Sequence, residues 1–140
     1  MIAIDTNVLL RYLLKDDVRQ SIKARKLIKG SERVLVTDIV LVETIWALRG
    51  TKYQLKKSDL TPVIQSLFEE PNIRFENSQV VWLALNNYQD AKPVRGKEAD
   101  FSDALIVAKA RHLIREQHET FNGVFTFDKA AQVLPDTKAP

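Results

Sequence analysis

Short apolar runs alternate along the chain with longer stretches in which apolar residues recur at helical spacing. The runs predict four short strands, at residues 1–4, 34–37, 73–75 and 123–127. The stretches between them predict helices, over about residues 6–14, 16–29, 38–49, 58–69, 78–89 and 101–116. A polar loop is expected at residues 90–99, and a last short helix is expected after Asp128. Asp38 and Ser78 are expected to cap the helices at whose starts they stand.

Strands that alternate with helices of about 10–15 residues are typical of a parallel sheet covered by helices on both faces. We therefore predict an α/β fold with three layers, α/β/α, around a short and mostly parallel central sheet. Right-handed crossovers make the strands of such a sheet point the same way, and its ligand sites lie at their carboxyl ends. We expect one domain over residues 1–134 and a loose tail over residues 135–140.

Composition narrows the chemistry that such a domain can perform. The 140 residues include no cysteine, which excludes a disulfide scaffold, thiolate zinc sites, iron–sulfur clusters and thiol catalysis. The two histidines, His112 and His118, are expected at the surface, so a metal would need oxygen ligands. No basic segment precedes Asp5, and no apolar run approaches the roughly 20 residues of a membrane span, so we expect a soluble cytoplasmic protein.

The positive charge is concentrated near the N-terminus. The formal net charge is +3, and residues 1–33 hold eight Lys and Arg against four acids. This distribution is compatible with a nucleic-acid partner. For the charge alone, a solvated helix face is the simpler explanation.

Four acidic residues stand at or near the ends of predicted strands. Asp5 follows the first strand and Asp128 follows the last, whereas Glu43 and Asp103 lie among apolar residues of two predicted helices. Each has a structural alternative, because an aspartate can cap a helix and Glu43 can point to solvent. Asp100 is itself a natural N-cap. No Lys or Arg stands three or four residues from Glu43 to pair with it.

Taken together, these acids predict a metal site at the edge of the sheet. Carboxylates that lie close together repel one another unless a cation sits between them, and Mg²⁺ and Mn²⁺ prefer oxygen ligands. Such a site usually acts on phosphate. The chain has no glycine-rich nucleotide loop, so hydrolysis of a phosphodiester polymer held by a basic surface remains.

Four blocks of the sequence, in order and over nearly the whole chain, resemble the motifs of PIN-domain nucleases. They are residues 4–10 with Asp5-Thr6-Asn7, residues 42–43 with Glu43, residues 99–106 with Asp103, and residues 124–128 with Asp128. The resemblance is closest to the VapC-type toxins of bacterial and archaeal toxin–antitoxin pairs.

The resemblance implies an endoribonuclease that depends on Mg²⁺ or Mn²⁺, with water attacking an RNA phosphodiester. Asp5, Glu43 and Asp103 would be metal ligands, with Asp128 as a fourth acid whose position varies in the family. The implied supporting residues are Thr6 and Thr126 as hydroxyls lining the site, Asn7 bonding across it, and Asp100 as a helix cap or the holder of a metal-bound water. Arg11, Lys15 or the loop at residues 92–97 could hold the RNA backbone.

The resemblance also implies partners. It predicts a homodimer and a cognate antitoxin protein, whose C-terminal Arg or Lys would fill the acidic cleft and exclude metal. Transfer, messenger and ribosomal RNA all remain as substrates, with one or two metals.

Three other functions can be compared with this one. A catalytically weak PIN-like RNA-binding module is the alternative to the nuclease. A phosphatase of the haloacid-dehalogenase type would need an aspartate where the chain has Asn7. A receiver domain would need its acid pair near the start, whereas Asp16 and Asp17 follow the first predicted helix.

Overall fold

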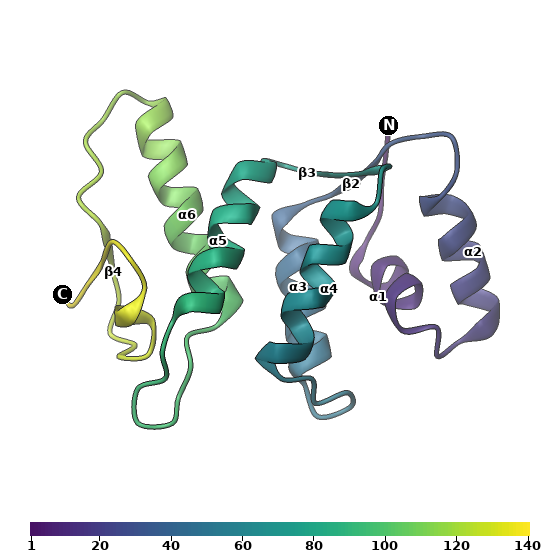
Figure 1. Ribbon diagram of the computed structural model, residues 1–140. Helices are drawn as coiled ribbons and strands as arrows, with labels where there is room; N and C mark the ends of the chain where they lie inside the picture. The colour runs from purple at the N-terminus through teal and green to yellow at the C-terminus, as the bar shows by residue number, and fades with distance from the viewer. The chain divides into compact units, whose positions relative to one another are not determined.

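The structure, a computed structural model, describes all residues from Met1 to Pro140, and the chain divides into two compact units (Figure 1). Unit 1 is Met1–Glu76 and unit 2 is Asn77–Pro140.

Unit 1 contains a three-stranded parallel sheet and four helices. The strands are β1 (Ile2–Ala3), β2 (Val34–Val36) and β3 (Ile73–Phe75), in the order β1-β2-β3. The helices are α1 (Thr6–Leu14), α2 (Val18–Ile28), α3 (Asp38–Arg49) and α4 (Lys57–Glu69). Val34 of the middle strand pairs with Ile2 on one side and Ile73 on the other.

The apolar positions of the sequence form the core of this unit. Val34 and Val36 are fully buried on the middle strand, and one face of each helix is buried with them. Burial of a Leu or Ile side chain contributes roughly 1.5–3 kcal/mol relative to exposure. The fully buried helical side chains include Leu9, Ile28, Leu41, Leu60 and Ile64.

Unit 2 is built around two packed helices, α5 (Ser78–Asp90) and α6 (Phe101–Glu116), which run side by side in Figure 1. Tyr88 and Phe101 meet edge to face between them, with ring centroids 5.8 Å apart. The chain then forms β4 (Val124–Phe125), the short 3₁₀ helix η1 (Ala131–Val133) and β5 (Thr137–Lys138). β4 and β5 pair in parallel.

The predicted α/β class with a short parallel sheet is confirmed, and most helices lie where the sequence pattern places them. Two caps differ from our expectation by one residue. Thr37 rather than Asp38 caps α3, and Asn77 rather than Ser78 caps α5, because these residues have extended backbones and side chains that accept from Val40 and Val80. The single domain over residues 1–134 stays a prediction.

The tail differs from the expectation of a loose segment. The Val124 amide donates to the Asp136 carbonyl at 2.8 Å, and the Thr126 amide donates to the Lys138 carbonyl at 2.9 Å. This approach requires Gly123, which has φ +105° and where an added Cβ would lie 2.9 Å from the Asp136 oxygen. The same pairing ends at Phe125, so the predicted strand 123–127 is shortened to two residues.

None of the helices has both the length and the apolar character that a membrane span requires.

Two hydrogen bonds to one carboxylate join three helical segments of unit 1. Glu70, at the end of α4, accepts from the Tyr12 hydroxyl at 2.9 Å and from Lys29 Nζ at 2.8 Å, and its side chain is only 8% exposed. The hydrogen bond from Lys29 lowers the pKa of Glu70, while burial and the hydrogen bond to Glu70 raise the pKa of Tyr12.

We predict that Glu70→Gln destabilises the protein at neutral pH and not in acid. A depressed pKa in the folded state stabilises the fold above the unfolded pKa, which is about 4.3 for Glu, and this contribution is lost as pH falls through the folded pKa. Urea unfolding should give a lower midpoint for the variant at pH 7, and the two midpoints should converge as the pH falls through the lowered folded-state pKa of Glu70. A difference that persists unchanged in acid would contradict this role of the charge.

Candidate active site

The first part of the candidate site lies in unit 1, where β1 leads into α1. Asp5 caps α1, with its Oδ1 accepting from the Val8 amide at 3.0 Å. The adjacent Thr6 donates its hydroxyl to Glu43 Oε2 of α3 at 2.7 Å. Thr6, which was expected to line the site, therefore bonds to one predicted acid and is the chain neighbour of another.

The orientation of Glu43 follows from the pattern of α3. Leu41, Ile45 and Leu48 are buried on one face of the helix, and Glu43 lies almost opposite them by helical spacing. Glu43 is exposed, as the structural alternative required, but its carboxylate has a partner in Thr6.

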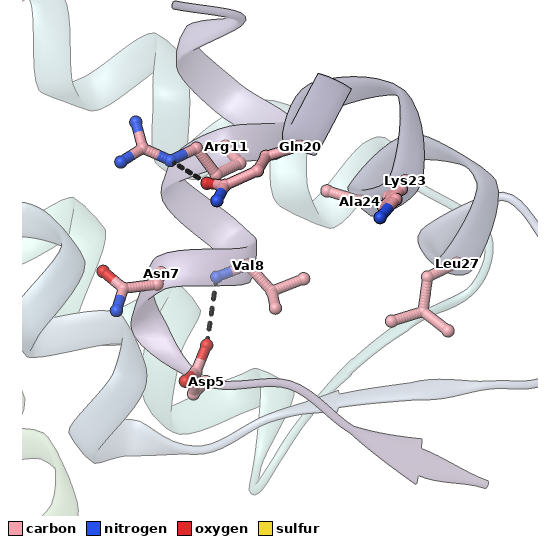
Figure 2. A pocket seen from close by; sticks show the side chains of 8 residues that line it. All are labelled: Asp5, Asn7, Val8, Arg11, Gln20, Lys23, Ala24 and Leu27. Carbon is pink, nitrogen blue, oxygen red and sulfur yellow. Dashed lines mark hydrogen bonds between the residues drawn. The ribbon is translucent and has the colours of Figure 1, made fainter. Parts of the chain in front are cut away.

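A cavity of about 330 Å³ lies next to Asp5 between α1 and α2 (Figure 2). Asn7 lines it with Asp5, and Arg11 and Lys23 contribute positive charge. Arg11 is fixed there, because its Nε donates to Gln20 Oε1 at 2.8 Å and its Nη1 to Asp16 Oδ1 at 2.8 Å. The bond to Asp16 raises the pKa of Arg11 and lowers that of Asp16. The bond of Asn7 across the site stays a prediction.

The second part of the candidate site lies in unit 2, at the start of α6. Asp100 and Asp103 form a reciprocal capping box, in which Asp103 Oδ2 accepts from the Asp100 amide at 3.0 Å and Asp100 accepts from the Asp103 amide. The expected role of Asp100 as a cap is thus observed.

Asp103 also faces a small cavity of about 130 Å³ that it shares with Thr126. The Thr126 hydroxyl accepts from the Asp128 amide at 3.0 Å, and Asp128 Oδ1 accepts from the Ala130 amide at 2.9 Å. Lys97 Nζ lies 4.0 Å from Asp128 Oδ1. These hydrogen bonds fix the turn after β4, and the shared cavity places Thr126 near Asp103 at the start of α6.

The structure therefore brings the predicted residues together in two groups. The first group contains Asp5, Thr6 and Glu43, and the second contains Asp100, Asp103, Thr126 and Asp128. Within neither unit do three acidic or histidine side chains converge as a metal cage. The joining of both groups in one four-carboxylate site stays a prediction.

The donor set of unit 1 suits a hard divalent cation. Asp5 uses Oδ1 to cap α1, and Glu43 uses Oε2 to accept from Thr6. Each carboxylate therefore has a second oxygen that could bind a cation. Carboxylate oxygens are the ligands that Mg²⁺ and Mn²⁺ prefer. Neither histidine competes, because His112 lies 3.3 Å from the Asn77 amide through Nε2 and His118 is exposed beyond the end of α6.

Several residues beside the acids were not singled out from the sequence. Gln20 reaches Arg11 only because α2 packs on α1, and Phe127 and Lys129 line a cavity next to Asp128. Only the position of Phe127 and Lys129 on either side of Asp128 could have indicated them.

Comparison with known proteins supplies the family. The crystal structure of VapC20 from Mycobacterium tuberculosis, described as a sarcin–ricin-loop-cleaving toxin, is similar over 94% of this chain and 93% of that chain, with 16% identity and a TM-score of 0.39. No curated protein matches the chain. The model of the PIN domain family matches residues 2–135, which include Asp5, Glu43, Asp100, Asp103 and Asp128. The chain therefore belongs to the PIN domain family.

Proposed function

We propose that the protein is an endoribonuclease that depends on Mg²⁺ or Mn²⁺ and acts as the toxin of a type II toxin–antitoxin pair. The observation that carries the proposal is the grouping of Asp5, Thr6 and Glu43 at the carboxyl end of β1, in a chain of the PIN domain family. Parallel sheets place their ligand sites at this end. We propose that it acts in the cytoplasm, as a homodimer with a cognate antitoxin, as the sequence resemblance implies.

The residues have distinct roles in this proposal. Asp5, Glu43 and Asp103 hold the metal and Asp128 serves as a fourth acid, while Thr6 positions Glu43 and Asp100 caps α6. A bound divalent ion polarises a phosphoryl oxygen and lowers the pKa of a coordinated water.

Cations of the chain hold the RNA in this proposal. Arg11 and Lys23 line the cavity beside Asp5, where they can donate hydrogen bonds to phosphate oxygens of the RNA backbone. Because Arg11 is fixed by Gln20 and Asp16, it would lose little conformational entropy when it binds phosphate. Such contacts position the strand and carry no sequence information.

We predict that Asp5→Asn, Glu43→Gln and Asp103→Asn each reduce Mg²⁺-dependent RNA cleavage by at least about a hundredfold, because a metal supplies several kcal/mol of charge stabilisation. The amide variants keep an oxygen that can accept the capping bonds, so circular dichroism should show an intact fold. RNA incubated with Mg²⁺, Mn²⁺ or EDTA provides the measurement.

Two substitutions are matched controls for these variants. Asp17 caps α2 as Asp5 caps α1, and Asp59 accepts from the Lys56 amide at 2.9 Å as Asp103 accepts from Asp100. Asp17→Asn and Asp59→Asn should cleave like the wild type. A wild-type protein that binds RNA but cuts none with either metal would instead indicate the RNA-binding module.

A second prediction separates the two acids of α6. We expect Asp103→Asn to abolish cleavage and Asp100→Asn to retain most of it, because Asp103 faces the cavity shared with Thr126 and Asp100 caps the helix. Both variants should be compared for cleavage and for thermal stability. Loss of cleavage in Asp100→Asn with full activity in Asp103→Asn would reverse the assignment.

A third prediction concerns Thr6 as a positioning residue. Thr6→Val keeps the shape of the side chain but removes the donor to Glu43, so we expect a metal affinity about 10–100-fold weaker. Thr6→Ser should restore it. The measurement is the Mg²⁺ concentration for half-maximal cleavage, together with direct Mn²⁺ binding. An unchanged metal requirement in Thr6→Val would contradict the role.

A further inference from the structure

Phe127 is the most exposed large apolar side chain of the protein, at 87%. It lies between Thr126 and Asp128, two residues of the candidate site. Its backbone is fixed on both sides, because the Asp128 amide donates to the Thr126 hydroxyl and the Ala130 amide donates to Asp128 Oδ1. The chain therefore fixes the backbone on both sides of an aromatic ring that is exposed to solvent.

Three cations line the same cavity as this ring. Phe127 lines a cavity of about 570 Å³ with Arg95, Lys97, Lys129 and Asp128. The cavity thus carries three positive charges and one negative charge. Only Lys97 approaches the carboxylate, with Nζ 4.0 Å from Asp128 Oδ1 and a side chain that is 74% exposed.

A rigid turn presents two of the cations. The Val94 amide donates to the Lys97 carbonyl at 2.8 Å, and the Lys97 amide donates to the Val94 carbonyl at 3.0 Å. The two residues between them, Arg95 and Gly96, have φ of 52° and 77°, the positive values of a type I′ turn. A turn closed in this way limits the conformational entropy lost when its side chains bind a ligand.

We propose that this surface, the Phe127 platform of Phe127, Arg95, Lys97 and Lys129, binds a nucleotide of single-stranded RNA. The base stacks on the Phe127 ring, and the phosphates on either side are held by the three cations. An exposed aromatic ring beside a basic surface is how proteins bind single strands, whose unstacked bases are free to stack on side chains. The proposal rests on the proposed ribonuclease function and adds to it the residues that hold one nucleotide of the substrate.

Charge favours RNA over a protein partner at this place. The antitoxin segment implied by the resemblance carries Arg or Lys, which would meet three like charges around Phe127. A polyanion gains from the same charges, and stacking on Phe127 would tolerate any base.

The test is the affinity for a short, labelled, single-stranded RNA, measured by fluorescence anisotropy with EDTA present so that no cleavage occurs. We expect Phe127→Ala to bind about tenfold more weakly and Phe127→Tyr to bind like the wild type. Trp82→Ala, which removes another exposed aromatic of unit 2, should leave the affinity unchanged. Because Phe127 is so exposed, its removal should not alter thermal stability.

Two further arms identify the base and the phosphates as the groups bound. An oligomer with abasic nucleotides should bind more weakly to the wild type, and Phe127→Ala should cause little additional loss with it. Arg95→Ala and Lys129→Ala should each weaken binding and reduce the slope of log affinity against log salt by about 0.7. Arg115→Ala, at the far end of α6, serves as the charge control.

The outcomes separate this proposal from the proposed function. If Phe127→Ala and the wild type bind the normal oligomer equally well, the Phe127 platform does not bind RNA. A protein partner would then be the expected occupant of this surface. A wild type that cuts no RNA with Mg²⁺ or Mn²⁺ overturns the nuclease. Weaker binding by Phe127→Ala supports the platform whether or not the wild type cleaves.

Discussion

The parallel pairing of β1 with β2 is the constraint on which the candidate site of unit 1 depends. Ile2 pairs with Val34 and Ala3 with Leu35, so both strands run in the same direction and each leads directly into a helix. α1 and α3 therefore begin at the same edge of the sheet, where Thr6 reaches Glu43. A shift of one residue would turn the strand faces over and separate this pair.

Capping and metal binding are compatible roles for the acids rather than alternatives. Asp5 caps α1, Asp103 belongs to the capping box of α6, and Asp128 accepts a hydrogen bond from the Ala130 amide. The folded chain thus holds these carboxylates at places where local structure already requires an acceptor.

The distribution of charge suits a polyanionic substrate in both units. Arg11 and Lys23 stand beside Asp5, and Arg95, Lys97 and Lys129 stand around Asp128. The net charge of +3 is therefore a small difference between acids that would bind metal and cations that would bind phosphate. The positive excess favours the approach of a polyanion, while a metal would offset the local repulsion of the acids.

Local sequence determined the elements whose signals lie within a few residues. The bounds of α1, β3 and α6 agree with the prediction, because apolar periodicity and an acceptor at the start of a helix define them. The four acids could likewise be named from their places near strand ends and from the family motifs. The caps Thr37 and Asn77 were missed because the choice between adjacent acceptors depends on the backbone angle at each residue.

Contacts between distant segments were decided only by the tertiary structure. Thr6 and Glu43 are 37 residues apart, and no local pattern indicates that a hydroxyl will meet that carboxylate. The pairing of the tail with β4 depends on the approach of Asp136 to Gly123. The Phe127 platform likewise needs a turn at residues 94–97 beside the end of β4. Sequence periodicity specifies which face of an element is buried, whereas packing specifies which exposed side chains become neighbours.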